Sequence, residues 1–197
     1  MQSIETEIKF RVHDDKALET KLASAGFRKQ TERTFERNVL YDYPDRKLRN
    51  NGEILRIREY GPKWVITHKA FPPDNSPEAR HKQRIETETV VEDGEAIATI
   101  FKHLGLVEAF TYEKWRTEWA DETGHCVLDV TPIGVFAEIE GPADWIDATA
   151  KKLGVDDSAF MTLSYGRLFD LWKQQTGSTA NDLTFDAIPG KPPQLSS

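Results

Sequence analysis

The 197-residue chain carries 26 Lys and Arg residues against 33 Asp and Glu residues, which gives a formal net charge of −7. A negative chain suits nucleic acid poorly, because broad nucleic-acid binding needs a basic face that displaces counterions. No stretch approaches the roughly 18 apolar residues of a membrane helix, and no secretory leader is recognisable. Cys126 is the only cysteine, which excludes an intramolecular disulfide and a cysteine-based zinc site. We therefore expect one cytoplasmic protein domain with no nucleic-acid partner and no membrane partner.

The charge is divided unevenly along the chain. Residues 1–90 hold 18 Lys and Arg against 15 Asp and Glu, whereas residues 91–197 hold 8 against 18. Surface charge that keeps the protein soluble explains this division as well as a functional arrangement of cations and carboxylates does. The position of each charge within the predicted secondary structure is therefore needed to choose between them.

The first predicted strand, residues 4–12, alternates between apolar and charged side chains, as period-two geometry requires of a half-buried strand. A helix follows, with Asp14 or Asp15 as its cap and Gly26 as its stop. The same alternation predicts further strands, in chain order, at residues 35–43, 53–60, 63–69, 82–91, 111–119, 125–131 and 135–140. Further helices are predicted at residues 95–104, 143–153 and 163–174.

Two segments are predicted to lack regular structure. Residues 70–81 contain three prolines, which is typical of a mobile loop and could form a lid. From Thr176 onward Gly, Ser, Pro and Asn dominate, which predicts a disordered tail. The sequence thus predicts a single domain over residues 1–175 and a tail over residues 176–197.

Nearly every predicted strand carries one ionic face. Seven carboxylates lie on these faces: Glu5, Glu7, Glu86, Glu88, Asp129, Glu138 and Glu140. Seven cations lie on the same faces: Lys9, Arg56, Arg58, Lys69, Arg84, Lys114 and Arg116. A single strand normally turns such a face to water, but the recurrence of Glu-x-Glu, Arg-x-Arg and Lys-x-Arg pairs favours a shared interior in which the charges compensate.

The opposite faces of these strands are apolar and need cover, which the four predicted helices can supply. A curved or closed sheet with its helices outside would bring the ionic faces together across its interior. Eight-stranded barrels leave an interior just wide enough for side chains or one small ligand. We therefore predict an α+β fold: an eight-stranded antiparallel β tunnel, closed or nearly closed, with a charged interior and helices packed outside.

This interior suits a triphosphate with its divalent cations, because Arg and Lys can bind phosphate oxygens while carboxylates bind metal. An all-oxygen set of ligands suits Mg²⁺ or Mn²⁺ and not zinc. The five histidines are scattered without the spacing of metal ligands. Neither a G-x-x-x-x-G-K-[ST] loop nor a G-x-G-x-x-G fingerprint is found, so side chains must recognise the phosphates.

The segment Glu5-Thr6-Glu7-Ile8-Lys9 resembles the N-terminal ExExK signature of the CYTH, or triphosphate tunnel metalloenzyme, superfamily. The resemblance spans residues 4–172. It continues through Leu55-Arg56-Ile57-Arg58, Thr67-His68-Lys69, Arg84-Ile85-Glu86-Thr87-Glu88, Lys114-Trp115-Arg116, Leu128-Asp129 and Gly134-Val135-Phe136-Ala137-Glu138-Ile139-Glu140. Each motif is weak alone, but their order and spacing together are specific. One departure is Val130, which stands where related sequences often carry a second acidic residue.

The resemblance implies an eight-stranded tunnel and a role for each charged residue. Phosphates would be bound by Lys9, Arg56, Arg58, Lys69, Arg84, Lys114 and Arg116. Metal ions would be bound by Glu5, Glu7, Glu86, Glu88, Asp129, Glu138 and Glu140. Lys69 and Glu7 are the candidate catalytic residues. Tight dimers occur in the superfamily, so a homodimer is a further expectation, although nothing in the sequence marks its interface.

Three functions remain open, because the superfamily includes class IV adenylyl cyclases, thiamine triphosphatases and inorganic tripolyphosphatases. Hydrolysis of a phosphoanhydride bond in an inorganic, thiamine or nucleoside triphosphate is preferred, because hydrolysis demands fewer parts than oriented cyclisation. The alternative is a class IV adenylyl cyclase that makes cyclic AMP and pyrophosphate from ATP, since Ser164-Tyr165-Gly166-Arg167-Leu168 resembles that branch. A non-catalytic binder of polyphosphate or nucleotide is disfavoured, because the whole ionic set is retained.

Overall fold

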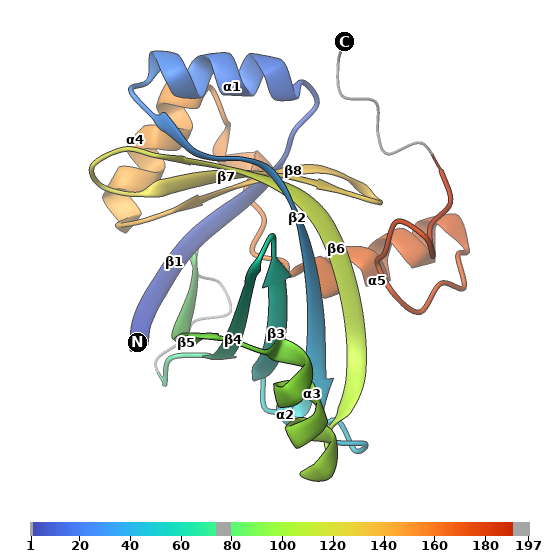
Figure 1. The fold of residues 1–197 in the computed structure, drawn as a ribbon. Coiled ribbons are helices and arrows are strands. Elements are labelled where there is room, and N and C mark those ends of the chain that lie inside the picture. Colours follow the sequence, from blue (N-terminus) through green and yellow to red (C-terminus); the bar gives the residue numbers. More distant parts are fainter. Residues whose placement is uncertain (1, 74–79, 191–197) are drawn as a thin grey trace.

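The computed structural model describes residues 2–73 and 80–190. Its eight strands form one closed antiparallel barrel in the order β1-β5-β4-β3-β2-β6-β7-β8, in which β1 pairs with both β5 and β8 (Figure 1). The strands are β1 (Gln2–Arg11), β2 (Arg28–Asp42), β3 (Ile54–Tyr60), β4 (Lys63–Ala70), β5 (Lys82–Val91), β6 (Val107–Ala120), β7 (His125–Thr131) and β8 (Gly134–Glu140). The predicted α+β tunnel of eight antiparallel strands is confirmed.

Strands β2 and β6 are longer than the sequence pattern predicts, with 15 and 14 residues. They pair along their length with several irregularities of register and form the tall wall on the right of Figure 1. The added residues 28–34 at the start of β2 are mostly exposed and polar on both faces. Alternation could not reveal them, because it requires that one face of the strand be buried.

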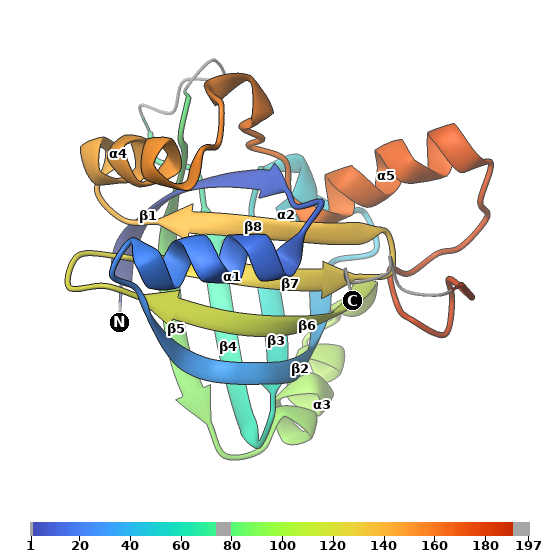
Figure 2. The same ribbon diagram turned by 90° about the horizontal axis from the view of Figure 1, so that it is seen from above.

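Two helices cover the outside of β1, β7 and β8: α1 (Asp15–Ser24) and α4 (Ala143–Leu153) (Figures 1 and 2). Asp14 begins α1, because its carboxylate accepts a hydrogen bond from the Ala17 backbone N–H at 2.8 Å. Beneath these helices lies the largest apolar cluster, in which Ile8, Leu22, Ile139 and Ile146 are completely buried. The outward faces of the strands are thus the core of the protein, as the sequence predicts.

The opposite side of the barrel is covered by α3 (Gly94–His103) and by the short helix α2 (Lys47–Asn50) (Figure 1). A second apolar cluster lies here between the helices and β2, β3 and β4, with Val39, Tyr41 and Ile57 buried. The sequence pattern predicts α3 but only a turn in place of α2. No helix within residues 2–73 and 80–190 is long and apolar enough to cross a membrane.

The C-terminal part packs against one end of the barrel. Helix α5 (Tyr165–Thr176) contributes Tyr165 and Phe169 to a third apolar cluster, together with the inward-facing rings of Tyr112 and Phe136. Figure 2 shows α5 extending away from the start of β8, on the side opposite the turn that joins β6 and β7. This helix therefore covers the interior of the barrel at that end.

The prediction of a disordered tail is wrong for residues 177–190. Leu183 is completely buried, its backbone N–H donates to the Thr111 carbonyl at 2.9 Å, and its carbonyl accepts from the Glu113 N–H at 2.9 Å. The Asp182 carboxylate also accepts from the Thr111 N–H at 2.7 Å. One buried leucine, two backbone hydrogen bonds and one side-chain hydrogen bond to β6 thus outweigh a polar composition. Residues 191–197 of the predicted tail, and residues 74–79 of the predicted lid, lie outside the described residues.

Candidate active site

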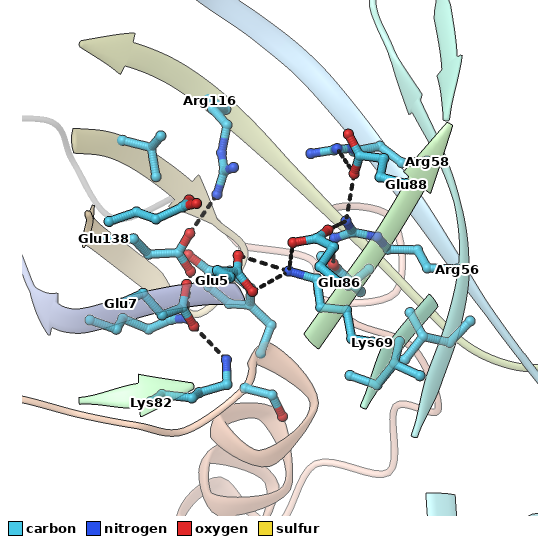
Figure 3. Close-up of a pocket in the computed structure, with 18 of the residues that line it drawn as sticks. Glu5, Glu7, Arg56, Arg58, Lys69, Lys82, Glu86, Glu88, Arg116 and Glu138 are labelled. Carbon is cyan, nitrogen blue, oxygen red and sulfur yellow. Dashed lines mark hydrogen bonds and ion pairs between the residues drawn. The ribbon is translucent and has the colours of Figure 1, made fainter. Parts of the chain in front are cut away.

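The inward faces of the strands enclose a cavity of about 510 Å³ (Figure 3). Six of the predicted phosphate ligands line it: Lys9, Arg56, Arg58, Lys69, Lys114 and Arg116. Six of the predicted metal ligands also line it: Glu5, Glu7, Glu86, Glu88, Glu138 and Glu140. Strict alternation along each strand therefore places these side chains on one interior surface, as the sequence predicts.

One group of ion pairs joins β1, β4 and β5. Lys69 Nζ lies 2.8 and 2.7 Å from the two carboxylate oxygens of Glu5 and 3.1 Å from Glu86 Oε2 (Figure 3). Burial and the nearby Arg56 act to lower the pKa of Lys69, but Glu5 and Glu86 outweigh them and leave it above its ordinary value. Lys69 is therefore a permanent cation at neutral pH and unsuited to act as a base.

A second group lies on β3, β4 and β5. Arg58 Nη2 donates to Glu88 Oε2 at 2.8 Å, and the Thr67 hydroxyl donates to the same oxygen at 2.9 Å. Arg56 donates to Thr67 Oγ1 at 3.1 Å and to the Tyr112 hydroxyl at 3.0 Å. The buried Nε atoms of Arg56 and Arg58 have no hydrogen-bond acceptor within the described part of the chain. Two buried donors are thus without an acceptor among residues 2–73 and 80–190.

A third group centres on Asp129 of β7, which is completely buried. Arg116 donates two hydrogen bonds to it, from Nε to Oδ1 at 2.7 Å and from Nη2 to Oδ2 at 2.6 Å. Lys114 Nζ lies 3.0 Å from Oδ2, and the Tyr165 hydroxyl donates to the same oxygen at 2.6 Å. Asp129 does not line the cavity, and its oxygens are occupied by these partners. Its role as a metal ligand stays a prediction.

Glu138 connects this group to β1. Its Oε2 lies 2.7 Å from Arg116 Nη2, and its Oε1 lies 2.5 Å from Lys9 Nζ. Burial acts to raise the pKa of Glu138, but Lys9 and Arg116 outweigh it and hold the pKa well below its usual range. Glu138 is thus ionised at neutral pH.

Arg84 also differs from its predicted placement. It is buried, but it does not line the cavity: Nη1 donates to the Gly52 carbonyl at 2.6 Å, and the guanidinium lies 3.7 Å from the centre of the Phe71 ring. These two contacts draw the side chain toward the turn before β3. Alternation assigns Arg84 to the interior face of β5 correctly but cannot show that the side chain leaves the cavity.

Strand β2 supplies two interior residues that the sequence reading omitted, Glu36 and Asn38. Glu36 is completely buried, with Oε1 3.4 Å from Lys114 Nζ and Oε2 3.8 Å from Arg116 Nε. Asn38 donates to Glu36 at 2.9 Å. Burial acts to raise the pKa of Glu36, but Lys114 and Arg116 lower it far below its usual range. The sequence does contain a signal for both residues. The alternation that predicts a strand at residues 35–43 places them on the face opposite Phe35 and Val39.

Two further residues that line the cavity are absent from the predicted site. Lys82 opens β5 and forms an ion pair with Glu7 inside the cavity (Figure 3). Burial acts to raise the pKa of Glu7, but Lys82 outweighs it, so Glu7 stays ionised. Tyr165 comes from α5, and its ring lies 4.3 Å from Lys9 Nζ and 4.9 Å from Lys114 Nζ. No strand pattern could reveal a helical residue that enters from the end of the barrel.

The environment of Glu140, at the end of β8, is opposite to that of Glu7 and Glu138, because it raises the pKa of the carboxyl group. Among the described residues it forms no ion pair, and burial together with the charges of Glu5 and Glu7 raises its pKa to about 7. No three acidic, histidine or cysteine side chains within residues 2–73 and 80–190 are arranged as a metal site. Glu5 and Glu7 are instead turned toward Lys69 and Lys82.

The model of the CYTH domain family matches residues 3–154 of the chain. A candidate adenylate cyclase of Methanocaldococcus jannaschii is 32% identical over 138 residues, which are 70% of this chain and 76% of that protein. The solved structure of a candidate adenylate cyclase from Vibrio parahaemolyticus superposes with a TM-score of 0.74 at 20% identity, over 85% of this chain and 98% of that one. A candidate adenylyl cyclase from Hippeastrum, described as having a dominant triphosphatase activity, gives a TM-score of 0.57 at 16% identity, over 85% of this chain and 96% of that one. Both structures share the fold of this chain.

Proposed function

The chain belongs to the CYTH domain family, and we propose that it is a divalent-metal-dependent enzyme that hydrolyses a phosphoanhydride bond of a triphosphate. The observation that carries the proposal is the gathering of cations from five strands on one cavity that they share with carboxylates. The cations that line the cavity are Lys9, Arg56, Arg58, Lys69, Lys82, Lys114 and Arg116. So many cations around one small volume suit a polyanion, and the accompanying carboxylates suit its counterions.

Arg56 and Arg58 are the central phosphate ligands in this proposal. Each has a buried Nε that donates to no acceptor within the described residues. A buried donor without a partner costs about 1–3 kcal/mol, and a phosphate oxygen would remove that cost once the guanidinium turns this N–H toward the cavity. Their planar guanidinium groups also match the geometry of phosphate, so both arginines would orient the substrate as well as neutralise it.

Glu5, Glu7, Glu138 and Glu140 would hold the divalent cation. Burial and the charges of Glu5 and Glu7 raise the pKa of Glu140 to about 7, so at this end of the cavity one carboxylate is left without an ion-pair partner among the described residues. The donors are all carboxylate oxygens, which Mg²⁺ and Mn²⁺ prefer. A bound cation would supply neutralisation of the phosphate charge and a water of lowered pKa.

Two residues are assigned to the reaction itself. Lys69 is a permanent cation, and in the proposal its Nζ holds a phosphate oxygen and stabilises the charge that develops as the phosphoanhydride bond breaks. Glu7 is ionised, and in the proposal it orients the water that attacks in line on the terminal phosphorus. Both would exchange their present partners, Glu5 and Lys82 respectively, for substrate and counterion.

The proposal is tested by product analysis. The protein is incubated with inorganic tripolyphosphate, thiamine triphosphate or ATP, each with Mg²⁺ or Mn²⁺, and the products are separated. Release of inorganic phosphate that stops when the metal is chelated supports the proposal. Binding without turnover of any of the three would contradict it and favour a non-catalytic polyphosphate or nucleotide binder. A matched preparation of Lys69→Ala controls for contaminating phosphatases.

The second candidate is a class IV adenylyl cyclase, in which the ribose 3′-hydroxyl attacks the α-phosphorus and pyrophosphate leaves. The observation that favours it is the 32% identity to a protein named as a candidate adenylate cyclase. The same incubation separates the two functions, because cyclic AMP and pyrophosphate from ATP would contradict the hydrolase assignment.

A further inference from the structure

Glu36 of β2 is a completely buried carboxylate that is incompletely satisfied. Its Oε1 accepts a hydrogen bond from the Asn38 side chain at 2.9 Å. Its Oε2 is buried as well and accepts no hydrogen bond within residues 2–73 and 80–190. Most buried polar atoms in proteins are hydrogen-bonded, because a buried oxygen without a donor has lost its water and is not compensated. A donor that reached Oε2 would therefore be bound favourably.

A donor close to this oxygen belongs to Arg116 of β6, whose Nε lies 3.8 Å from Oε2. Charge-assisted N–H···O bonds are about 2.7–2.9 Å long, so a shift of about 1 Å would form one. The strand register favours this contact, because Glu36 pairs with Lys114, which stands two residues before Arg116 on the same face of β6. Glu36 and Arg116 are thus diagonal neighbours on the ladder between β2 and β6.

Arg116 is shared among three carboxylates. It donates to Asp129 from Nε at 2.7 Å and from Nη2 at 2.6 Å, and the same Nη2 donates to Glu138 at 2.7 Å (Figure 3). Burial acts to lower the pKa of Arg116, but these two carboxylates and Glu36 outweigh it and hold the pKa well above its ordinary value. Glu36 thus attracts the guanidinium from 3.8 Å, without a hydrogen bond to it.

Glu138 has two competing partners in the proposed function. It is one of the carboxylates that would hold the divalent cation, and in this structure it bonds to Arg116 and Lys9. A carboxylate that turns toward a metal ion gives up bonds to cationic side chains, because both compete for the same oxygens. The Arg116 side chain is only 11% exposed, so the loss of one bonded carboxylate would be costly to it.

We propose that Glu36 is a positioning residue for the metal site, which accepts Arg116 from Glu138 when Glu138 turns to a divalent cation. This inference rests on the metal dependence of the proposed function and adds to it a completely buried residue. The transfer satisfies Oε2 of Glu36, keeps the charge of Arg116 compensated and releases Glu138. The hydrogen bond from Asn38 to Oε1 holds the Glu36 carboxylate in place for it.

The inference is tested by the equilibrium binding of Mn²⁺ alone to the full chain, measured by calorimetry. Glu36→Gln keeps the size of the side chain and removes its charge. Glu138 then stays with Arg116, and we expect the dissociation constant for Mn²⁺ to rise about tenfold. Glu118→Gln is the matched control, because it removes a half-buried carboxylate of β6 that accepts a hydrogen bond from Thr31. Its dissociation constant should stay within about twofold of the wild type, and a loss equal to that of Glu36→Gln would overturn the inference.

The transfer requires Arg116, which gives the experiment a second arm. Arg116→Gln keeps a donor for Asp129 but removes the cation that Glu138 must release. In this background Glu36→Gln should change the dissociation constant for Mn²⁺ by less than about twofold, because both changes act through one contact. An equal loss in both backgrounds would overturn the inference, since it would show a general effect of charge. An unchanged Mn²⁺ affinity in Glu36→Gln, with only a lower midpoint of urea unfolding, would overturn it too, because a structural role gives that result.

Glu36→Asp covers the case in which Glu36→Gln does not fold. It keeps the charge but sets it one methylene farther from Arg116, and we expect the dissociation constant for Mn²⁺ to rise by at least about threefold. An unchanged value would overturn the inference, as would a wild type that binds no Mn²⁺.

Failure of the proposed function is recognised separately, by the release of phosphate from tripolyphosphate. A wild type that releases no phosphate but shows the coupling between Glu36 and Arg116 in Mn²⁺ binding contradicts the function and supports the inference. Hydrolysis without that coupling contradicts the inference alone.

Discussion

The interior of the barrel contains two groups of carboxylates that differ in how their negative charge is compensated. In the Asp129 cluster, formed by Asp129, Lys114, Arg116 and Tyr165, the buried carboxylate accepts four hydrogen bonds. In the Glu140 cluster, formed by Glu5, Glu7 and Glu140, charges of one sign face each other, and burial with Glu5 and Glu7 raises the pKa of Glu140 to about 7. The carboxylate of the first cluster is neutralised by cations of the protein, whereas a bound cation would lower the repulsion within the second. A list of inward-facing carboxylates does not reveal this difference.

Asp129→Asn should have the largest effect of the changes considered. The variant keeps the shape of the side chain but leaves Lys114 and Arg116 facing a neutral amide in a buried site. Breaking a buried ion pair from one side costs about 3–5 kcal/mol, and we expect the free energy of unfolding to fall by that amount in urea titrations. A loss below about 1 kcal/mol would show that Asp129 is not the anchor described above.

Glu140→Gln is the matched change in the other cluster. The change leaves no buried cation without its partner, so the free energy of unfolding should be unchanged or higher. Metal-dependent turnover should fall by about 100-fold. The pKa of Glu140 is raised in the folded protein, so its contribution to stability is present at low pH and lost as pH rises through about 7. Without added metal, unfolding between pH 5 and pH 8 should therefore depend less on pH in the variant. A rate equal to that of the wild type would remove Glu140 from the metal ligands.

Arg58→Ala tests the phosphate ligands on the opposite wall of the cavity. Arg58 forms its closest ion pair with Glu88, whose side chain is 37% exposed, so its removal should change the free energy of unfolding little. A lost hydrogen bond to a charged group is worth about 1.5–3 kcal/mol, and the dissociation constant for tripolyphosphate should rise by about 10- to 100-fold. Normal binding by calorimetry would exclude Arg58 from the phosphate ligands.

Tyr165→Phe gives the smallest expected effect. The ring remains over Lys9 and Lys114, but the hydroxyl bond to Asp129 at 2.6 Å is lost. A hydrogen bond to a charged group within a buried network suggests a loss of about 1–2 kcal/mol in the free energy of unfolding. Leu168→Ala on the same helix removes packing alone and serves as the control. An unchanged midpoint of urea unfolding for Tyr165→Phe would show that Lys114 and Arg116 satisfy the Asp129 carboxylate without the Tyr165 hydroxyl.

The sequence predicts the barrel and most of the cavity because period-two alternation translates directly into an inward face. Glu5, Glu7 and Lys9 on β1, and Glu138 and Glu140 on β8, are predicted on this ground alone. Alternation determines the direction in which a side chain leaves the backbone, and it carries no information about where a long side chain ends. This is why Arg84 is assigned to the cavity although its guanidinium reaches Gly52 and Phe71.

Other residues depend on contacts between distant segments. Tyr165 reaches Asp129 because α5 packs at the end of the barrel, and Leu183 is buried because its backbone bonds to β6. Neither contact is encoded in a local pattern. Leu40, Ile54, Phe110 and Gly166 likewise line the cavity from β2, β3, β6 and α5, so they become visible as a group only in the folded protein.

The closure of the barrel by β1 has a consequence for how the protein is made. The ion pair between Lys9 and Glu138 joins residues that are 129 positions apart, and pairings of such separation form slowly because a long loop must close first. During translation β1 leaves the ribosome long before β8 exists. The carboxylates of β1 therefore meet their partners only after nearly the whole domain has been synthesised. Triphosphate binding should accordingly appear in the last steps of folding. A nascent chain that ends before β8 should not bind a triphosphate.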